Sequence, residues 1–304
     1  MLIPHSLRTT MIMITSCLKT NQKIDKWTRI VGQKLLELTA IVSIIFLYLP
    51  IIILVIYSFN ESRLNAVWRG FTLKWYQSLF EGVAGQADIA TEQIWNALFN
   101  SLWVGGIATI AATVMGTLIG LAMERFRFKG KSALEALLFL PIIIPDITMG
   151  ISLLIFFSLF FQLIQTLTGV RLVLGLPTVI IGHIAFNISY VAVTVRTRIA
   201  ELDPTLEEAA LDLGANEWRT FYRITLPLIA PGIISGALLA FTLSLDDFVI
   251  TFFTAGVGAT TLPVFIYGMI KLSVTPAINA ISTLMLVASL MILACSLVLQ
   301  RQKT

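Results

Sequence analysis

The chain has 304 residues, of which 57% are hydrophobic and only 12% are charged, whereas soluble domains carry about 25% charged residues. Together with a mean hydropathy of +0.89, this composition excludes a conventional water-soluble enzyme. The net charge of +4 does not indicate a nucleic-acid partner, because membrane topology accounts for Lys and Arg residues that lie between long apolar runs. Two cysteines, Cys17 and Cys295, support neither a disulfide framework nor a cysteine-based metal site, and we expect no metal in this chain.

The apolar runs predict an all-α protein that crosses a membrane six times. An arm, residues 1–37, precedes the first run, and a tail, residues 300–304, follows the last. A bilayer core about 30 Å thick takes roughly 20 helical residues. The segments that meet this length are 38–59, 97–123, 137–164, 177–199, 228–253 and 277–299. The first is too long for a signal-peptide core and is expected to remain as an anchor.

The distribution of Lys and Arg predicts the orientation. Sixteen of the 21 basic residues lie in the arm, between the second and third spans, around the fourth-to-fifth connection and in the tail. Cytoplasmic loops of membrane proteins are enriched in these residues. Both termini are therefore predicted to be cytoplasmic, with membrane lipid around the spans.

The outer connection, residues 60–96, is rich in aromatic residues. Trp68, Trp75, Tyr76 and Trp95 suit an amphipathic segment at the outer interface, where aromatic rings prefer to lie. Trp75 and Tyr76 are also candidates for cation–π attraction of an ammonium group at the mouth of a pathway. Interfacial anchoring is the alternative role for both.

Three acids fall inside predicted spans: Asp146 in the third, and Asp246 with Asp247 in the fifth. Charged side chains inside a membrane are expensive and usually mark a pathway or a neutralising partner. Because no Lys or Arg lies at comparable depth, the acids favour a cationic substrate. For Asp146 the alternative is a cap at a helix end broken by Pro141 and Pro145.

Polar residues near these acids extend the candidate pathway. Ser244 lies two residues before Asp246 and could hydrogen-bond a primary amine. His183 and Asn187, four residues apart on the fourth span, could face the same cavity. Hydrogen bonding between helices is the alternative for His183 and Asn187.

The inner connection, residues 200–227, is predicted to fold as a helix, a glycine turn and a second helix. Asp203 and Pro204 form a helix-start pair, Gly214 permits the left-handed residue that ends a helix, and Asn216 can cap the next one. Its acidic balance and small alanines favour docking into a groove on a soluble partner over lying on an anionic leaflet. A plain structural loop is the alternative.

This connection resembles a known family. Glu208-Ala209-Ala210, Gly214, Ile224 and Leu226-Pro227 match, at the right spacing, the EAA motif of inner-membrane permeases of binding-protein-dependent ABC importers. The resemblance implies a type I importer permease fold, with a coupling helix between helices 4 and 5 that inserts into an ATP-hydrolysing subunit. The residues assigned to this coupling are Glu207, Glu208, Ala209, Ala210, Asp212, Gly214 and Glu217.

A narrower resemblance covers most of residues 38–300. The stretches Tyr57-Ser58-Phe59-Asn60, Trp68 to Tyr76, Pro145-Asp146-Ile147, Ser244-Leu245-Asp246-Asp247 and Pro276 to Ala280 look like those of spermidine/putrescine importer permeases. Two departures stand out. The arm looks longer than in that family, so the start could be Met11 or Met13, and residues 162–176 look like an outer insertion.

The resemblance implies a transport subunit of the bacterial inner membrane that works by alternating access. Its partners would be two copies of an ABC ATPase, a second homologous permease and an extracytoplasmic polyamine-binding protein. The chain has no Walker A motif, so ATP and Mg²⁺ would be bound by the ATPase subunits and no cofactor by this chain. The alternatives are a permease for thiamine, ferric iron or an opine, and a secondary transporter, which should show an inverted repeat.

Overall fold

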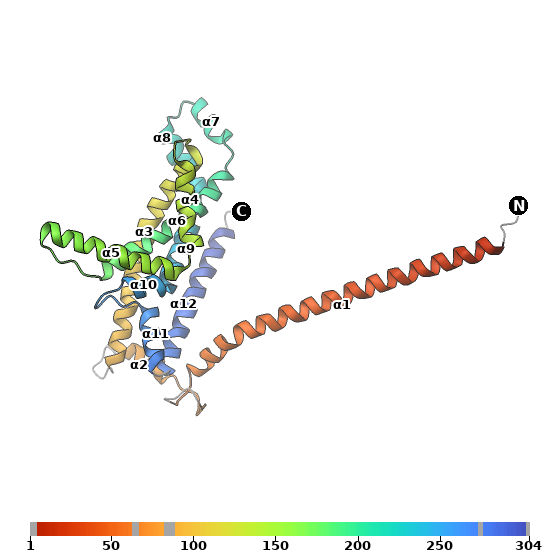
Figure 1. Ribbon diagram of the computed structural model, residues 1–304, viewed down its shortest axis with the longest axis horizontal. Helices are drawn as coiled ribbons and strands as arrows, with labels where there is room; N and C mark the ends of the chain where they lie inside the picture. Colours follow the sequence, from red (N-terminus) through yellow and green to blue (C-terminus); the bar gives the residue numbers. More distant parts are fainter. Residues whose placement is uncertain (1–4, 63–66, 82–88, 273–275, 302–304) are drawn as a thin grey trace. The chain divides into compact units, whose positions relative to one another are not determined.

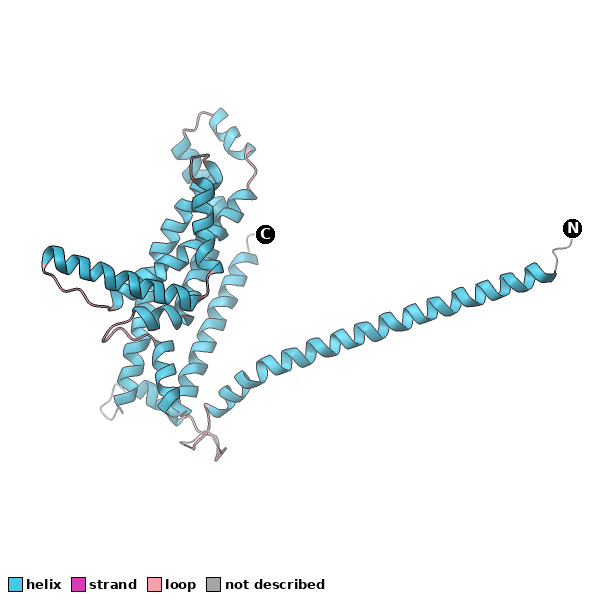
Figure 2. Cartoon of the chain, viewed as in Figure 1, coloured by secondary structure: helices cyan, strands magenta, loops and turns pink. Residues whose placement is uncertain are grey.

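The computed structural model describes residues 5–62, 67–81, 89–272 and 276–301. These ranges are almost entirely helical (Figure 2). One isolated antiparallel bridge joins Asn60 and Phe71. In chain order (Figure 1), the helices are α1 (His5–Tyr57), α2 (Lys74–Glu81), α3 (Ile89–Arg125), α4 (Lys131–Ile143), α5 (Asp146–Thr168), α6 (Leu176–Ala200), α7 (Thr205–Asp212), α8 (Glu217–Thr220), the π-helical turn η1 (Phe221–Thr225), α9 (Leu226–Asp246), α10 (Val249–Thr254), α11 (Leu262–Leu272) and α12 (Pro276–Arg301).

α1 forms a unit of its own, and a second unit begins at Ser58. Within the part of α1 at Val31–Tyr57, the most apolar stretch has a mean hydropathy of 2.9, and none of that stretch is buried. Exposed Leu, Ile and Val side chains of this kind match a helix whose surface is covered by lipid. Residues 302–304 of the predicted tail lie outside the described residues.

Five helices in the described ranges are long and apolar enough to cross a membrane: Val31–Tyr57, Glu92–Arg125, Asp146–Thr168, Leu176–Ala200 and Glu217–Asp246. In α12 the apolar part, Ile278–Met291, is shorter. All six predicted ranges are helical for most of their length, but the third and the fifth are each interrupted. The number of membrane crossings stays a prediction.

The core of the second unit is the packing of α3, α6 and α9 against one another. On α3, Gly116 and Gly120 are four residues apart and meet α6: a Cβ at Gly116 would lie 2.7 Å from Val191 Cβ and 2.9 Å from the Ile188 carbonyl oxygen. Small residues at this spacing let two membrane helices approach closely. Val191 is fully buried in this contact, within an apolar cluster that also includes Ile229.

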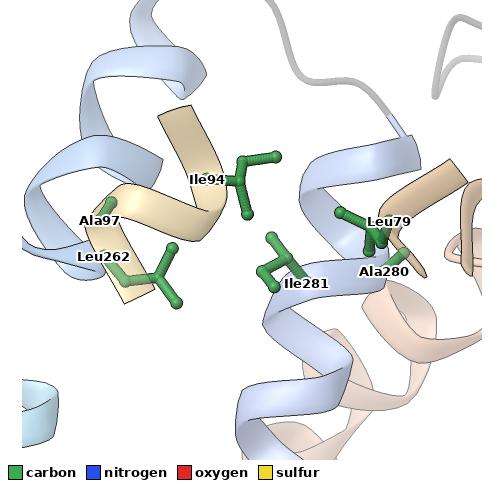
Figure 3. Packing of buried hydrophobic residues seen from close by; sticks show 6 residues of the cluster. All are labelled: Leu79, Ile94, Ala97, Leu262, Ala280 and Ile281. Atoms are coloured by element: carbon green, nitrogen blue, oxygen red, sulfur yellow. The ribbon is translucent and has the colours of Figure 1, made fainter. Parts of the chain in front are cut away.

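A second apolar cluster joins α2, α3, α11 and α12. Figure 3 shows its buried side chains, which come from all four helices: Leu79, Ile94, Ala97, Leu262, Ala280 and Ile281. The side chains of Trp75 and Tyr76 pack against this cluster. The cluster therefore ties the short helix α2, which lies within the predicted outer connection, to longer helices far along the chain.

Two predicted spans are broken, for different reasons. Between α4 and α5, Ile144 and Pro145 are both extended, with ψ of 135°, since proline disfavours a helical residue before it. Between α9 and α10, Asp247 is extended with φ −65° and ψ 125°, although no Pro or Gly is present. There the Asp247 side chain accepts hydrogen bonds from the Ile250 and Thr251 amides and so starts α10.

Candidate functional site

The two helix breaks meet at a cavity of about 270 Å³, which we call the acidic cavity. The first turns of α5 and α10, the last turn of α9, and parts of α4 and α6 surround it. Its lining residues are Pro141, Asp146, Phe186, Tyr190, Leu243, Asp246, Asp247, Phe248, Val249 and Ile250. All three intramembrane acids identified in the sequence therefore line one cavity.

Asp146 is the first residue of α5, directly after Pro145, and its side chain is exposed. The unpaired amides of a helix N-terminus carry partial positive charge, which stabilises a carboxylate in the first turn. The position of Asp146 is thus favourable for the helix whether or not a ligand is bound.

Asp247 is held by its own surroundings. Its carboxylate accepts hydrogen bonds from the Ile250 amide at 3.2 Å and from the Thr251 amide and hydroxyl, both at 2.9 Å. His183 Nε2 lies 3.2 Å from the Asp247 carboxylate, whose side chain is only 10% exposed. Both carboxylate oxygens are therefore occupied within the protein, and Asp247 joins α10 to α6.

Asp246 differs from its neighbour. It is the last residue of α9, its side chain is exposed to the acidic cavity, and within the described residues it has neither a hydrogen bond nor an ion pair. A helix C-terminus carries partial negative charge from its unpaired carbonyl groups. A carboxylate there is unfavourable by itself and favours a cation, so Asp246 is the acid best placed to bind one.

The other polar candidates on α6 and α9 are buried beside the cavity rather than lining it. Asn187 Nδ2 donates to Ser244 Oγ at 2.8 Å, and His183 Nε2 lies 2.9 Å from Thr251 Oγ1. These contacts hold α6 to α9 and α10. The α6 residues that do line the cavity are Phe186 and Tyr190.

Sequence reasoning missed this aromatic pair. Phe186 and Tyr190 are four residues apart, which is the spacing of neighbours on one helix face, and their rings meet edge-on with centroids 6.5 Å apart. Phe186 directly precedes the predicted site residue Asn187, and Tyr190 follows it by three residues. Aromatic faces attract ammonium groups. The spacing of four between two aromatic residues is therefore the feature of the sequence that predicts a cation-binding face on α6.

Trp75 and Tyr76 lie elsewhere. Trp75 Nε1 donates to the Asn60 carbonyl oxygen at 2.7 Å, and the Tyr76 hydroxyl lies 2.6 Å from Ser58 Oγ. Their polar atoms thus fasten α2 to the segment after α1, and neither residue lines the acidic cavity. Among the described residues, no three His, Cys, Asp or Glu side chains are grouped so that they could hold a metal ion.

The 200–227 loop contains α7, a turn, α8 and η1. Gly214 has φ +85°, and the Ala215 amide donates to the Ala210 carbonyl oxygen at 3.0 Å, which is the Schellman arrangement at a helix end. Asn216 Oδ1 accepts from the Arg219 amide at 2.8 Å. The left-handed glycine and the Asn216 cap predicted from the sequence are both observed.

Much of the surface of the 200–227 loop consists of exposed apolar and acidic side chains. The side chains of Leu206, Leu211, Leu213 and Trp218 are exposed, Leu213 and Trp218 by 89% and 74%. Glu208, Ala209, Asp212 and Glu217 are exposed too, whereas Ala210 is buried. An apolar surface bordered by acids has the character of a docking site.

Glu207 points inward, unlike its acidic neighbours. Both of its carboxylate oxygens accept from the guanidinium of Arg125, and one also accepts from the Thr225 hydroxyl. Burial acts to raise the pKa of the Glu207 carboxyl, but these hydrogen bonds outweigh it and hold the pKa below its usual value. The interaction is therefore present at neutral pH and is lost only as the pH falls through that lowered pKa.

Replacing Gly214 with Ala is expected to loosen the end of α7. Nothing lies within 4 Å of a Cβ at this position, so the cost is the left-handed backbone alone, about 1–2 kcal/mol. Faster hydrogen exchange of the amides of residues 205–215 would report it. Gly214→Asn is the matched control, because Asn tolerates this conformation, and equal exchange in the Ala variant and the wild type would contradict the argument.

Comparison with known proteins identifies the family. Residues 112–303 match the family described as "Binding-protein-dependent transport system inner membrane component". The chain is 42% identical over 242 residues to the putrescine transport system permease protein PotI of Escherichia coli K12, covering 79% of this chain and 82% of that protein. It is 39% identical over 259 residues to the spermidine/putrescine transport system permease protein PotC of the same strain, covering 85% and 91%.

Solved structures share the fold. A bacterial ABC transporter involved in the import of the acidic polysaccharide alginate matches with a TM-score of 0.69 and 21% identity, over 91% of this chain and 99% of that chain. An amino acid ABC transporter matches with a TM-score of 0.52 and 17% identity, over 70% and 94%. The resemblance found in the sequence is thus confirmed: this chain belongs to the inner-membrane components of binding-protein-dependent transport systems.

Proposed function

We propose that this chain is one of two transmembrane subunits of an ATP-driven importer that carries polyamines such as putrescine and spermidine into the cytoplasm. The observation that carries the proposal is Asp246, a carboxylate at the C-terminus of α9 that faces the acidic cavity and has no partner in the part of the chain that the structure describes. Both the carboxylate and the end of the helix favour a cation there. The names of the relatives PotI and PotC point to the same substrate class.

The acidic cavity suits one end of an alkyl diamine. Leu243, Phe186 and Phe248 supply apolar surface for methylene groups, and the faces of Phe186 and Tyr190 attract an ammonium group. Ligand pockets usually span about 300–1,000 Å³, so a cavity of about 270 Å³ fits a small solute. Asp146 would contribute a second negative charge, while Asp247 supports the site by fixing α10.

Transport by alternating access requires partners, which the family supplies. Two ABC ATPase subunits would bind ATP and Mg²⁺, and the exposed 200–227 loop would dock into one of them through Glu208, Ala209, Ala210 and Gly214. A second homologous permease would complete the membrane channel, and an extracytoplasmic binding protein would deliver the polyamine. A solved relative of the fold is in complex with its periplasmic protein. Both termini of this chain would then be cytoplasmic.

The proposal is tested by reconstituting the chain with its cognate ATPase, partner permease and binding protein in proteoliposomes. ATP-dependent uptake of labelled putrescine or spermidine is the expected result, with excess unlabelled polyamine as competitor. Thiamine, ferric iron and an opine serve as alternative solutes. Uptake of one of these with no uptake of polyamine would refute the substrate assignment while leaving the family assignment intact.

A further inference from the structure

The position of α7 depends on few contacts. The helix has eight residues, and Ala210 is its single buried residue. Leu206, Leu211 and Leu213 face outward, so apolar packing holds α7 only weakly against the rest of the protein. A short helix that a partner displaces needs a polar contact to transmit the displacement to the longer helices.

Arg125 supplies such a contact. It is the last residue of α3, and its two terminal nitrogens donate to the two carboxylate oxygens of Glu207 on α7. Thr225, which immediately precedes α9, donates to the same carboxylate. A single side chain of α7 is thus bound to the end of α3 and to the start of α9.

The preceding residue of α3 makes a separate connection. Glu124 accepts from Arg196 of α6 at 3.0 Å, and Arg196 also donates to Glu135 of α4 at 2.5 Å. This second cluster joins α3, α4 and α6 and leaves α7 out. The C-terminal end of α3 is therefore bound to α6 through Glu124 and to the 200–227 loop through Arg125.

We propose that Arg125 is a positioning residue that couples α7 to α3 and α9 during transport, and that Glu207 serves this internal contact instead of meeting the ATPase. The inference rests on the proposed function and deepens it. Displacement of α7 by a docked ATPase is passed through Arg125 to α3, and α3 packs on α6 and α9, which line the acidic cavity.

The chemistry of the contact suits a rigid link. A guanidinium and a carboxylate joined by two parallel hydrogen bonds fix both distance and orientation, which a single ammonium cannot do. The side chains of Arg125 and Glu207 are 34% and 19% exposed, so water is partly excluded from the pair. Arg125→Lys should therefore keep the charge but lose part of the coupling.

The first experiment measures polyamine molecules transported per ATP hydrolysed in the reconstituted complex. Arg125→Ala is expected to lower this ratio about tenfold, within the usual range of coupling energies between sites, and Arg125→Lys should give an intermediate value. Exchanging the charges with Arg125→Glu and Glu207→Arg should restore part of the ratio. Arg127→Ala is the matched control, because it removes an exposed charge two residues away and should leave the ratio unchanged.

The second experiment measures hydrogen exchange of the amides of residues 205–212 in the full chain embedded in lipid nanodiscs. Arg125→Ala should accelerate exchange there several-fold, and Arg127→Ala should not. This reading needs neither assembly nor polyamine transport, so it separates failure of the inference from failure of the proposed function. Unchanged exchange in Arg125→Ala, or an unchanged transport ratio in an assembled complex, would overturn the role of Arg125.

Discussion

Asp246→Asn is expected to reduce polyamine uptake by roughly 10- to 150-fold while leaving the complex assembled. A hydrogen bond to a charged group contributes about 1.5–3 kcal/mol, and Asp246 has no partner within the described residues that would compensate for the lost charge. Asn has nearly the same shape, so the fold should be retained. Initial rates of labelled putrescine uptake, normalised to the amount of intact complex, measure the effect.

The other two acids provide the comparison. Asp146→Asn removes a charge that stabilises the first turn of α5, an effect of about 0.3–1 kcal/mol, and should reduce uptake less than Asp246→Asn. Asp247→Ala removes four contacts that hold α10 and His183, so it should lower the yield of folded protein. If Asp246→Asn transports normally, Asp246 is not the ammonium site.

Gly116→Ala is expected to destabilise the packing of α3 on α6. The added methyl group would meet Val191 Cβ at 2.7 Å and the Ile188 carbonyl oxygen at 2.9 Å, and backbone atoms cannot rotate away. Overpacking of this kind costs about 1–3 kcal/mol. We expect a lower melting temperature and a smaller yield of monodisperse protein in detergent.

Gly106→Ala is the control for this substitution. Gly106 lies on the same helix with nothing within 4 Å of a Cβ, and Ala favours a helix over Gly by about 1 kcal/mol. The control should therefore be neutral or slightly stabilising. Equal melting temperatures for the two variants would mean that α3 and α6 do not approach as closely as the structure has them.

The sequence predicts the structure best where a residue type has a strong preference for one local backbone conformation. Pro145 predicts the break before α5, and Gly214 and Asn216 predict the turn between α7 and α8. Each of these residues acts through its own backbone or through the nearest amides. No residue type in the sequence predicts the break in the helix after Asp246. It depends on Asp247 accepting bonds from α10 and from His183, which is 64 positions away in the chain.

The same limit applies to the candidate site. Three acids in spans were recognised as a group, but their different roles follow from which end of a helix each one occupies. Trp75 and Tyr76 pack against the apolar cluster that joins α2, α3, α11 and α12. Phe186 and Tyr190, by contrast, line the acidic cavity. Composition cannot separate these pairs, because the distinction arises from tertiary packing.

The break at Asp247 gives two adjacent and chemically identical residues separate duties. Asp246 is the last residue of α9, and Asp247 accepts the first amides of α10, so the exact residue at which α9 stops decides which carboxylate is left without a partner among the described residues. Shifting the sequence by one residue through this point would put one aspartate in the other's place and an apolar residue, Leu245 or Phe248, in the remaining place. Deletion or insertion of a single residue in 241–246 should therefore be more harmful than a conservative substitution of either aspartate.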